Sequence, residues 1–63
     1  MNGKDFTKGF SCVIADLIRV YDQPTLAIGI MNANGVTVED MRKSGVIKAD
    51  LWLIESEYLK TVV

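Results

Sequence analysis

Few residues in this chain could carry out chemistry. Cys12 is the only cysteine among 63 residues, and the chain has no histidine. A cysteine nucleophile needs a general base or a positive environment to form its thiolate, and histidine is the usual base. On a helical wheel Cys12 falls near Arg19 on a polar face. We therefore expect it to be an accessible but ordinary small residue.

Two glutamates, Glu55 and Glu57, come closest to a pair of catalytic carboxylates. Residues two positions apart on a helix point to different faces, so these side chains cannot act together on one substrate atom. The chain also lacks a calcium-binding acidic loop and the cysteine and histidine clusters that bind zinc. The sequence thus predicts a protein that is not an enzyme, with no catalytic residue, no metal and no cofactor.

Trp52 is the most informative side chain for function. At about 100° per residue it lies a quarter turn from the apolar row of its helix, with Leu59 directly beneath it. Tryptophan is enriched at the centres of protein interfaces, because it buries a large rigid area and keeps an N–H group for a partner. Another helix of the same chain could equally cover this flank, but the small interior favours a partner.

The apolar content is high for so short a chain. Hydrophobic residues make up 49 % of the sequence and charged residues 24 %, while a domain of this size buries only about 60 % of its unfolded surface. A single cysteine excludes an intrachain disulfide. We therefore expect one domain, residues 1–63, that forms a homodimer or contacts another protein through apolar surface. The predicted partner-binding residues are Trp52, Leu59, Ile28 and Met31.

Charge and hydropathy restrict the setting. Seven basic against eight acidic residues give a net charge of −1, unlike the basic patch of a nucleic-acid-binding protein. No apolar run approaches the length of about 20 residues that spans a membrane, and residues 1–5 lack the pattern of a signal peptide. Together with the lone thiol, these features predict a cytoplasmic protein that contacts no membrane.

Apolar residues recur at spacings of three and four along the whole chain. This periodicity predicts an all-α fold, a small bundle of about four short helices at approximately 6–21, 24–34, 38–44 and 48–60. Pro24 suits the first position of the second helix, and Gly35 and Gly45 suit the ends of the second and third. Thr37, with Asp40 three residues later, predicts a capping box.

The same spacing predicts which side chains face the core. In the second helix Ile28 points away from the main row. The predicted core rows are Phe6, Phe10, Val13, Ile14, Leu17, Ile18 and Tyr21 in the first helix; Leu26, Ile30 and Ala33 in the second, widened by Ala27 and Met31; Val38 and Met41 in the third; and Ile47, Leu51, Ile54, Tyr58 and Val62 in the fourth.

The order of helix, glycine turn and capped helix in the middle of the chain is also that of a helix-turn-helix. In that motif the second helix enters the major groove of DNA, and Arg42, Lys43 and Lys48 would contact it. Against this alternative, Glu39 and Asp40 place two carboxylates where the polyanion would lie. A simple structural corner is favoured, and nucleic acid is not the expected partner.

The segment Tyr21-Asp22-Gln23-Pro24-Thr25-Leu26-Ala27, followed by Ile30, Gly35-Val36-Thr37 and Asp40-Met41, resembles short uncharacterised helical proteins encoded by bacteriophages and prophages. The resemblance covers roughly half of the chain and carries no active-site residues. It implies a setting in the cytoplasm of a bacterial host, where many small phage proteins bind and inhibit host proteins, including those of defence complexes.

Overall fold

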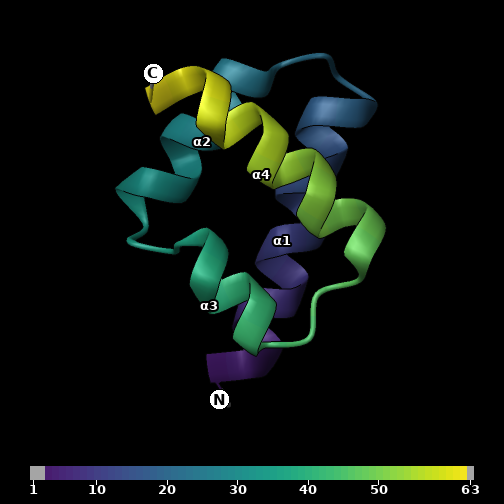
Figure 1. The fold of residues 1–63 in the computed structure, drawn as a ribbon, viewed down its shortest axis with the longest axis vertical. Coiled ribbons are helices and arrows are strands. Elements are labelled where there is room, and N and C mark those ends of the chain that lie inside the picture. Colours follow the sequence, from purple (N-terminus) through teal and green to yellow (C-terminus); the bar gives the residue numbers. More distant parts are fainter. Residues whose placement is uncertain (1–2, 63) are drawn as a thin grey trace.

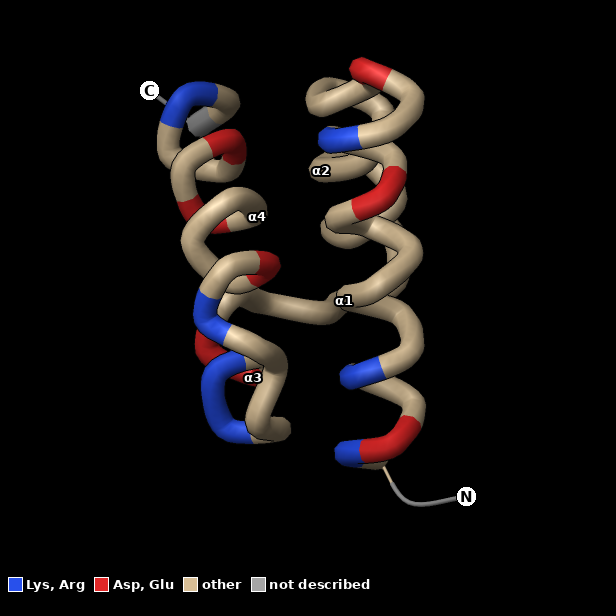
Figure 2. Tube along the Cα trace, turned by 90° about the vertical axis from the view of Figure 1, so that its right-hand side faces the viewer, with Lys and Arg blue, Asp and Glu red and all other residues tan. Residues whose placement is uncertain are grey.

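Short turns join four α-helices in the described part of the chain. The structure, a computed structural model, describes residues 3–62, and the side chains of residues 3–61. The helices are α1 (Gly3–Arg19), α2 (Pro24–Ala33), α3 (Val38–Lys43) and α4 (Lys48–Val62) (Figure 1). Seen from the side, α1 and α2 form one layer and α3 and α4 the other (Figure 2). The prediction of a small all-α bundle is confirmed.

The helix ends follow local backbone chemistry. Gly35 and Gly45 have positive φ values of 68° and 81°, which glycine adopts without steric cost, and they follow the ends of α2 and α3 as predicted. Asp22 has φ 52° and the amide of Gln23 donates to the carbonyl of Leu17 (2.8 Å). Because this left-handed turn closes α1, the helix ends at Arg19 rather than at the predicted residue 21.

The start of α3 has the predicted capping box. The amide of Asp40 donates to Thr37 Oγ1 (3.0 Å), and the amide of Thr37 donates to Asp40 Oδ2 (3.0 Å). These bonds satisfy two backbone donors that a helix start leaves unpaired. At the start of α2, Gln23 occupies the capping position beside Pro24, but its side chain makes no capping hydrogen bond.

The core lies between the two layers and is small. Every helix contributes to it, but α4 contributes only one fully buried side chain among those described. The nine buried apolar residues are Ile14, Ala15, Ile18, Ala27, Ile28, Met31, Val36, Met41 and Ile54.

The inward face of α1 is only partly the predicted one: Ile14 and Ile18 are buried as expected, but the face is rotated. Thr7 and Ser11 are buried, whereas Phe6, Val13 and Tyr21 are exposed. The hydroxyl of Thr7 donates to the carbonyl of Gly3 (2.9 Å) and that of Ser11 to the carbonyl of Thr7 (2.6 Å). Such bonds to the preceding turn satisfy small hydroxyls inside a protein. Thr7 therefore lies inside α1 as a buried residue.

The orientation of α2 corrects a second prediction. Ile28 and Met31, expected to meet a partner, are fully buried core residues, while Leu26, expected in the core, is exposed. Nearly every position of this helix is apolar, so the hydrophobic pattern cannot identify the inward face. Packing against α1 and α4 selects the face that carries Ala27, Ile28 and Met31.

In α4 the predicted core row is only partly correct. Ile54 is fully buried, and Leu51 and Tyr58 are half-buried against the core. Ile47 lies just before the helix and is exposed. The side chain of Val62 lies outside the described residues. Much of the apolar surface of α4 therefore remains accessible.

The corrected orientation of α2 predicts how its variants unfold. Ile28→Val should lower the free energy of unfolding by about 0.5–1.5 kcal/mol and Met31→Ala by about 2–5 kcal/mol, because both remove buried groups. The exposed control Leu26→Ala should change it by less than about 0.5 kcal/mol. Urea unfolding monitored by circular dichroism measures all three. A larger loss for Leu26→Ala than for Met31→Ala would contradict the assignment of faces.

The capping box predicts a dependence of stability on pH. The hydrogen bonds from Thr37 lower the pKa of Asp40 below its ordinary value. The charged carboxylate therefore stabilises the fold above its unfolded pKa of about 3.9, and this contribution is lost as the pH falls through the lower folded pKa. The stability difference between the wild type and Asp40→Asn should stay constant from pH 7 to about 5 and shrink below about pH 4. Equal differences at pH 7 and pH 3 would refute this role.

Candidate functional site

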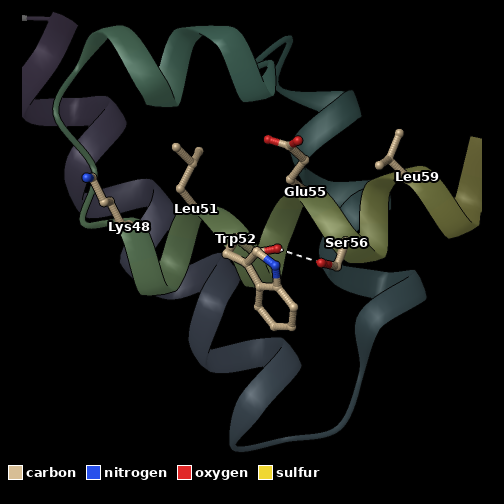
Figure 3. A pocket seen from close by; sticks show the side chains of 6 residues that line it. All are labelled: Lys48, Leu51, Trp52, Glu55, Ser56 and Leu59. Carbon is tan, nitrogen blue, oxygen red and sulfur yellow. Dashed lines mark hydrogen bonds between the residues drawn. The ribbon is translucent and has the colours of Figure 1, made fainter.

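The outward face of α4 carries a shallow groove. It has a volume of about 350 Å³ and is lined entirely by this helix, through Lys48, Leu51, Trp52, Glu55, Ser56 and Leu59. Leu51, Glu55 and Leu59 project to one side of the helix, and the indole of Trp52 projects to the other (Figure 3). We call this surface the α4 groove.

The spacing of the lining residues explains why they share one surface. Lys48, Trp52, Glu55 and Leu59 follow one another at intervals of four, three and four, which places them in one row along a helix. Ile54 faces the core from the opposite side of α4. The packing that buries Ile54 therefore turns the row of the α4 groove toward solvent.

Trp52 is the most exposed large apolar residue described. Its relative exposure is 71 %, and that of Leu59 is 54 %. The hydroxyl of Ser56 donates to the backbone carbonyl of Trp52 (2.8 Å), whereas the indole N–H makes no hydrogen bond within the described chain. The side chain thus offers a partner both a large apolar area and an available donor.

The two charged side chains of the α4 groove differ in whether they have an ion-pair partner. Glu55 accepts a hydrogen bond from Arg42 of α3 (2.8 Å), and the same guanidinium also binds Glu39. Lys48, at the opposite end of the groove from Leu59, forms no ion pair with any described residue. The groove therefore combines apolar side chains with one available cation.

The structure separates the four predicted partner-binding residues into two pairs. Trp52 and Leu59 lie together in the α4 groove, while Ile28 and Met31 are fully buried between the layers. A partner could reach the second pair only if the bundle opened. Leu51 and Ser56 also line the groove, but they were not among the predicted partner-binding residues. Ser56 lies four residues after Trp52, so the helical spacing could have identified it.

The basic residues considered for DNA binding do not form one patch. Acidic and basic segments are interspersed through both layers (Figure 2). Arg42 is held by two carboxylates, Lys48 lies at the α4 groove, and Lys43 is exposed near the end of α3. A DNA-binding face needs cations that are free to neutralise phosphates, so this arrangement does not favour the helix-turn-helix alternative.

Cys12 is exposed, as expected. It lines a second groove of about 290 Å³ between α1 and the start of α4, with Lys8 and Asp50 also in the lining. Arg19 donates to Asp50 (2.6 Å), and this bond raises the pKa of the guanidinium. Because Asp50 is hydrogen-bonded to Arg19, it is not available as a general base for the Cys12 thiol.

Glu55 and Glu57 have separate basic partners, as expected for residues on different faces of the helix. Glu57 pairs with Lys60 (3.4 Å), and Glu55 pairs with Arg42. Among the described residues, no three potential ligands lie close enough together to hold a metal ion. Within the same part of the chain, no helix is both long and apolar enough to cross a membrane.

No protein-family model matches the chain, and comparisons with curated proteins and with solved structures find no match. These comparisons therefore assign neither a family nor a function to the chain.

The geometry predicts the response of Trp52, the only tryptophan, to a neutral quencher. In dilute protein its fluorescence should be quenched by acrylamide almost as efficiently as in the urea-unfolded chain, because the indole is largely exposed. A blue-shifted emission that acrylamide barely quenches would show that the indole is buried, and would contradict the described position of the side chain.

Proposed function

We propose that the chain is a small, non-catalytic protein-interaction protein that binds another protein through the α4 groove. The observation that carries the proposal is the exposure of Trp52 and Leu59, which line the same groove on a surface that no other described helix covers. The proposal needs no catalytic residue, cofactor or metal.

The energetics of binding favour this surface. Burying apolar area stabilises a complex by about 25 cal/mol per Å², and Trp52 has the highest relative exposure among the large apolar side chains described. Tryptophan residues at interface centres often dominate the binding energy, while the surrounding contacts mainly exclude water. Leu51 and Leu59 provide such surroundings on the same helix.

The shape of the groove indicates the kind of partner segment. A row at intervals of four, three and four is the pattern that packs against another α-helix. The complementary segment is an amphipathic helix whose apolar residues meet Trp52 and Leu59. A carboxylate near one end of that segment would meet Lys48, which has no ion-pair partner among the described residues.

The biological setting of the proposal comes from the resemblance to phage-encoded proteins. A small protein of that kind acts by occupying a functional surface of a host protein, and the host cytoplasm is where it would meet its target. A helix of the target, laid along the α4 groove, would then be unable to contact its normal partner.

The proposal predicts a partner that depends on Trp52. The tagged wild-type chain should retain a defined protein from a bacterial host lysate, and Trp52→Ala should lower the affinity of the purified pair about 30-fold or more, as for other interface tryptophans. Leu59→Ala should act in the same direction. Isothermal titration calorimetry with the identified protein measures both effects.

Leu26→Ala is the matched control, because Leu26 is as exposed as Leu59 but lies on α2. It should leave the affinity unchanged, and all three variants should keep the circular dichroism spectrum of the wild type. If every captured protein binds Trp52→Ala as tightly as the wild type, the α4 groove is not the binding surface.

A further inference from the structure

The turn between α2 and α3 contains a chemically reactive pair of residues. Asn34 follows the last residue of α2, and Gly35 comes directly after it. Asparagine is among the less durable residues of a protein, because the backbone nitrogen of the next residue can attack its side-chain amide. The attack is least hindered when the next residue is glycine, which has no Cβ. The turn is therefore a candidate site of spontaneous covalent modification.

Both residues of the pair are accessible to water. Asn34 and Gly35 are exposed, and a Cβ placed on Gly35 would meet no other heavy atom within 4 Å. The turn runs along the outside of the molecule, between the end of α2 and the start of α3 (Figure 1). Base and water can therefore reach the atoms that would react.

The folded backbone nevertheless holds the two reacting groups apart. The Nδ2 group of Asn34 donates to the carbonyl of Ile30 (2.8 Å), and the amide of Gly35 donates to the carbonyl of Asn32 (3.0 Å). Asn34 has ψ 1°, whereas ring closure needs the nitrogen of Gly35 in line with Cβ of Asn34, about a third of a turn away. Both hydrogen bonds must break before the nitrogen can attack.

We infer that Asn34 and Gly35 form a self-modification site, at which the folded chain slowly converts Asn34 through a cyclic imide. The rate is set by opening of the last turn of α2. Helix ends open at a much smaller free-energy cost than the whole fold, so the folded chain reaches the reactive geometry without unfolding. The inference uses no residue of the α4 groove and does not depend on the proposed function.

The reaction needs only base and water. The backbone nitrogen of Gly35 loses its proton and forms a bond to Cγ of Asn34. The bond between Cγ and Nδ2 then breaks, and Nδ2 takes up a proton and leaves as ammonia. Water adds to one of the two carbonyls of the ring. Opening at Cγ gives aspartate, whereas opening at the backbone carbonyl gives isoaspartate, in which the chain runs through the former side chain.

The products should be less stable than the original chain. Either product loses the hydrogen bond to Ile30 and places a carboxylate at the negative end of the α2 dipole. Isoaspartate also adds one carbon to the backbone before Gly35. That insertion displaces the next residue, Val36, which is buried and whose amide donates to the carbonyl of Met31 (3.2 Å). The isoaspartate form should therefore lose more stability than the aspartate form.

Peptide mass spectrometry tests the site. The wild type is incubated for weeks at mildly alkaline pH, folded or in urea, and then cleaved with trypsin, which releases a fragment from Val20 to Arg42. The mass increase that accompanies replacement of an amide by an acid should appear at Asn34 in both samples. It should form about tenfold or more slowly in the folded chain, because only the open turn reacts.

Two asparagines serve as comparisons. Asn32 lies in the same fragment but precedes Ala33, so it should stay unmodified. The other pair of asparagine and glycine, Asn2 and Gly3, falls in a separate fragment that ends at Lys4 and is scored on its own. An unmodified Asn34 in the folded chain would overturn the inference, and so would equal rates in the folded and unfolded chains.

The variant Val36→Ala tests control by the turn. It removes a buried anchor of the turn without changing either reacting residue. Conversion of Asn34 should become several-fold faster in the folded variant, whereas the rate in urea should match that of the wild type. Leu26→Ala, on an exposed position of α2, should leave both rates unchanged. An unchanged rate in folded Val36→Ala would refute control by opening of the turn.

Urea unfolding of the separated products tests the consequence. Reversed-phase chromatography separates the two products, and Asn34→Asp provides the aspartate form independently. The midpoint of unfolding should fall from the wild type to the aspartate form and fall further for the isoaspartate form. An isoaspartate form as stable as the wild type would contradict the stated effect on Val36.

Discussion

The small size of the interior is the constraint on which the rest of the structure depends. Four short helices enclose nine buried apolar side chains among the described residues, and no disulfide reinforces them because the chain has one cysteine. A helix can turn only one face toward such a core. Both α1 and α4 carry apolar residues on a second face, so the fold itself produces uncovered apolar surface.

The α4 groove combines Trp52, an available indole N–H and Lys48, which forms no ion pair with a described residue. This chemistry suits a partner with an apolar face and an acidic group. Helix α3 contributes the buried Met41 to the core and contacts α4 through the ion pair between Arg42 and Glu55.

Much of the fold could be predicted because its signals are local. Pro24, Gly35, Gly45 and the pair Thr37 and Asp40 determine where helices begin and end through backbone conformation and capping bonds, whatever lies further along the chain. The end of α1 was less predictable, because a positive φ at an aspartate such as Asp22 is a minor preference.

The inward faces were harder to predict because tertiary packing chooses them. In α2 almost every position is apolar, so the hydrophobic pattern did not separate Ile28 and Met31, which are buried, from Leu26, which is exposed. In α1 the inward face includes the hydroxyls of Thr7 and Ser11, which an apolar pattern does not identify. Their burial is tolerated because their hydrogen bonds stay within the helix.

The candidate site was predictable to the extent that it lies on one helix. Trp52 and Leu59 share a row by spacing alone, without reference to any other element. Whether that row faced solvent depended on the position of Ile54 in the core, which the sequence pattern of α4 only partly indicated.

The central claim is that apolar surface is left over after the chain has folded. Paramagnetic relaxation of side-chain protons by a soluble gadolinium chelate, recorded in dilute protein, tests it most directly. Val13, Val20 and Trp52 should relax fast, while Ile28, Met31 and Ile54 should be protected. Protection of Val13 and Trp52 in the most dilute sample would show that the chain covers its own apolar faces, which would contradict the account.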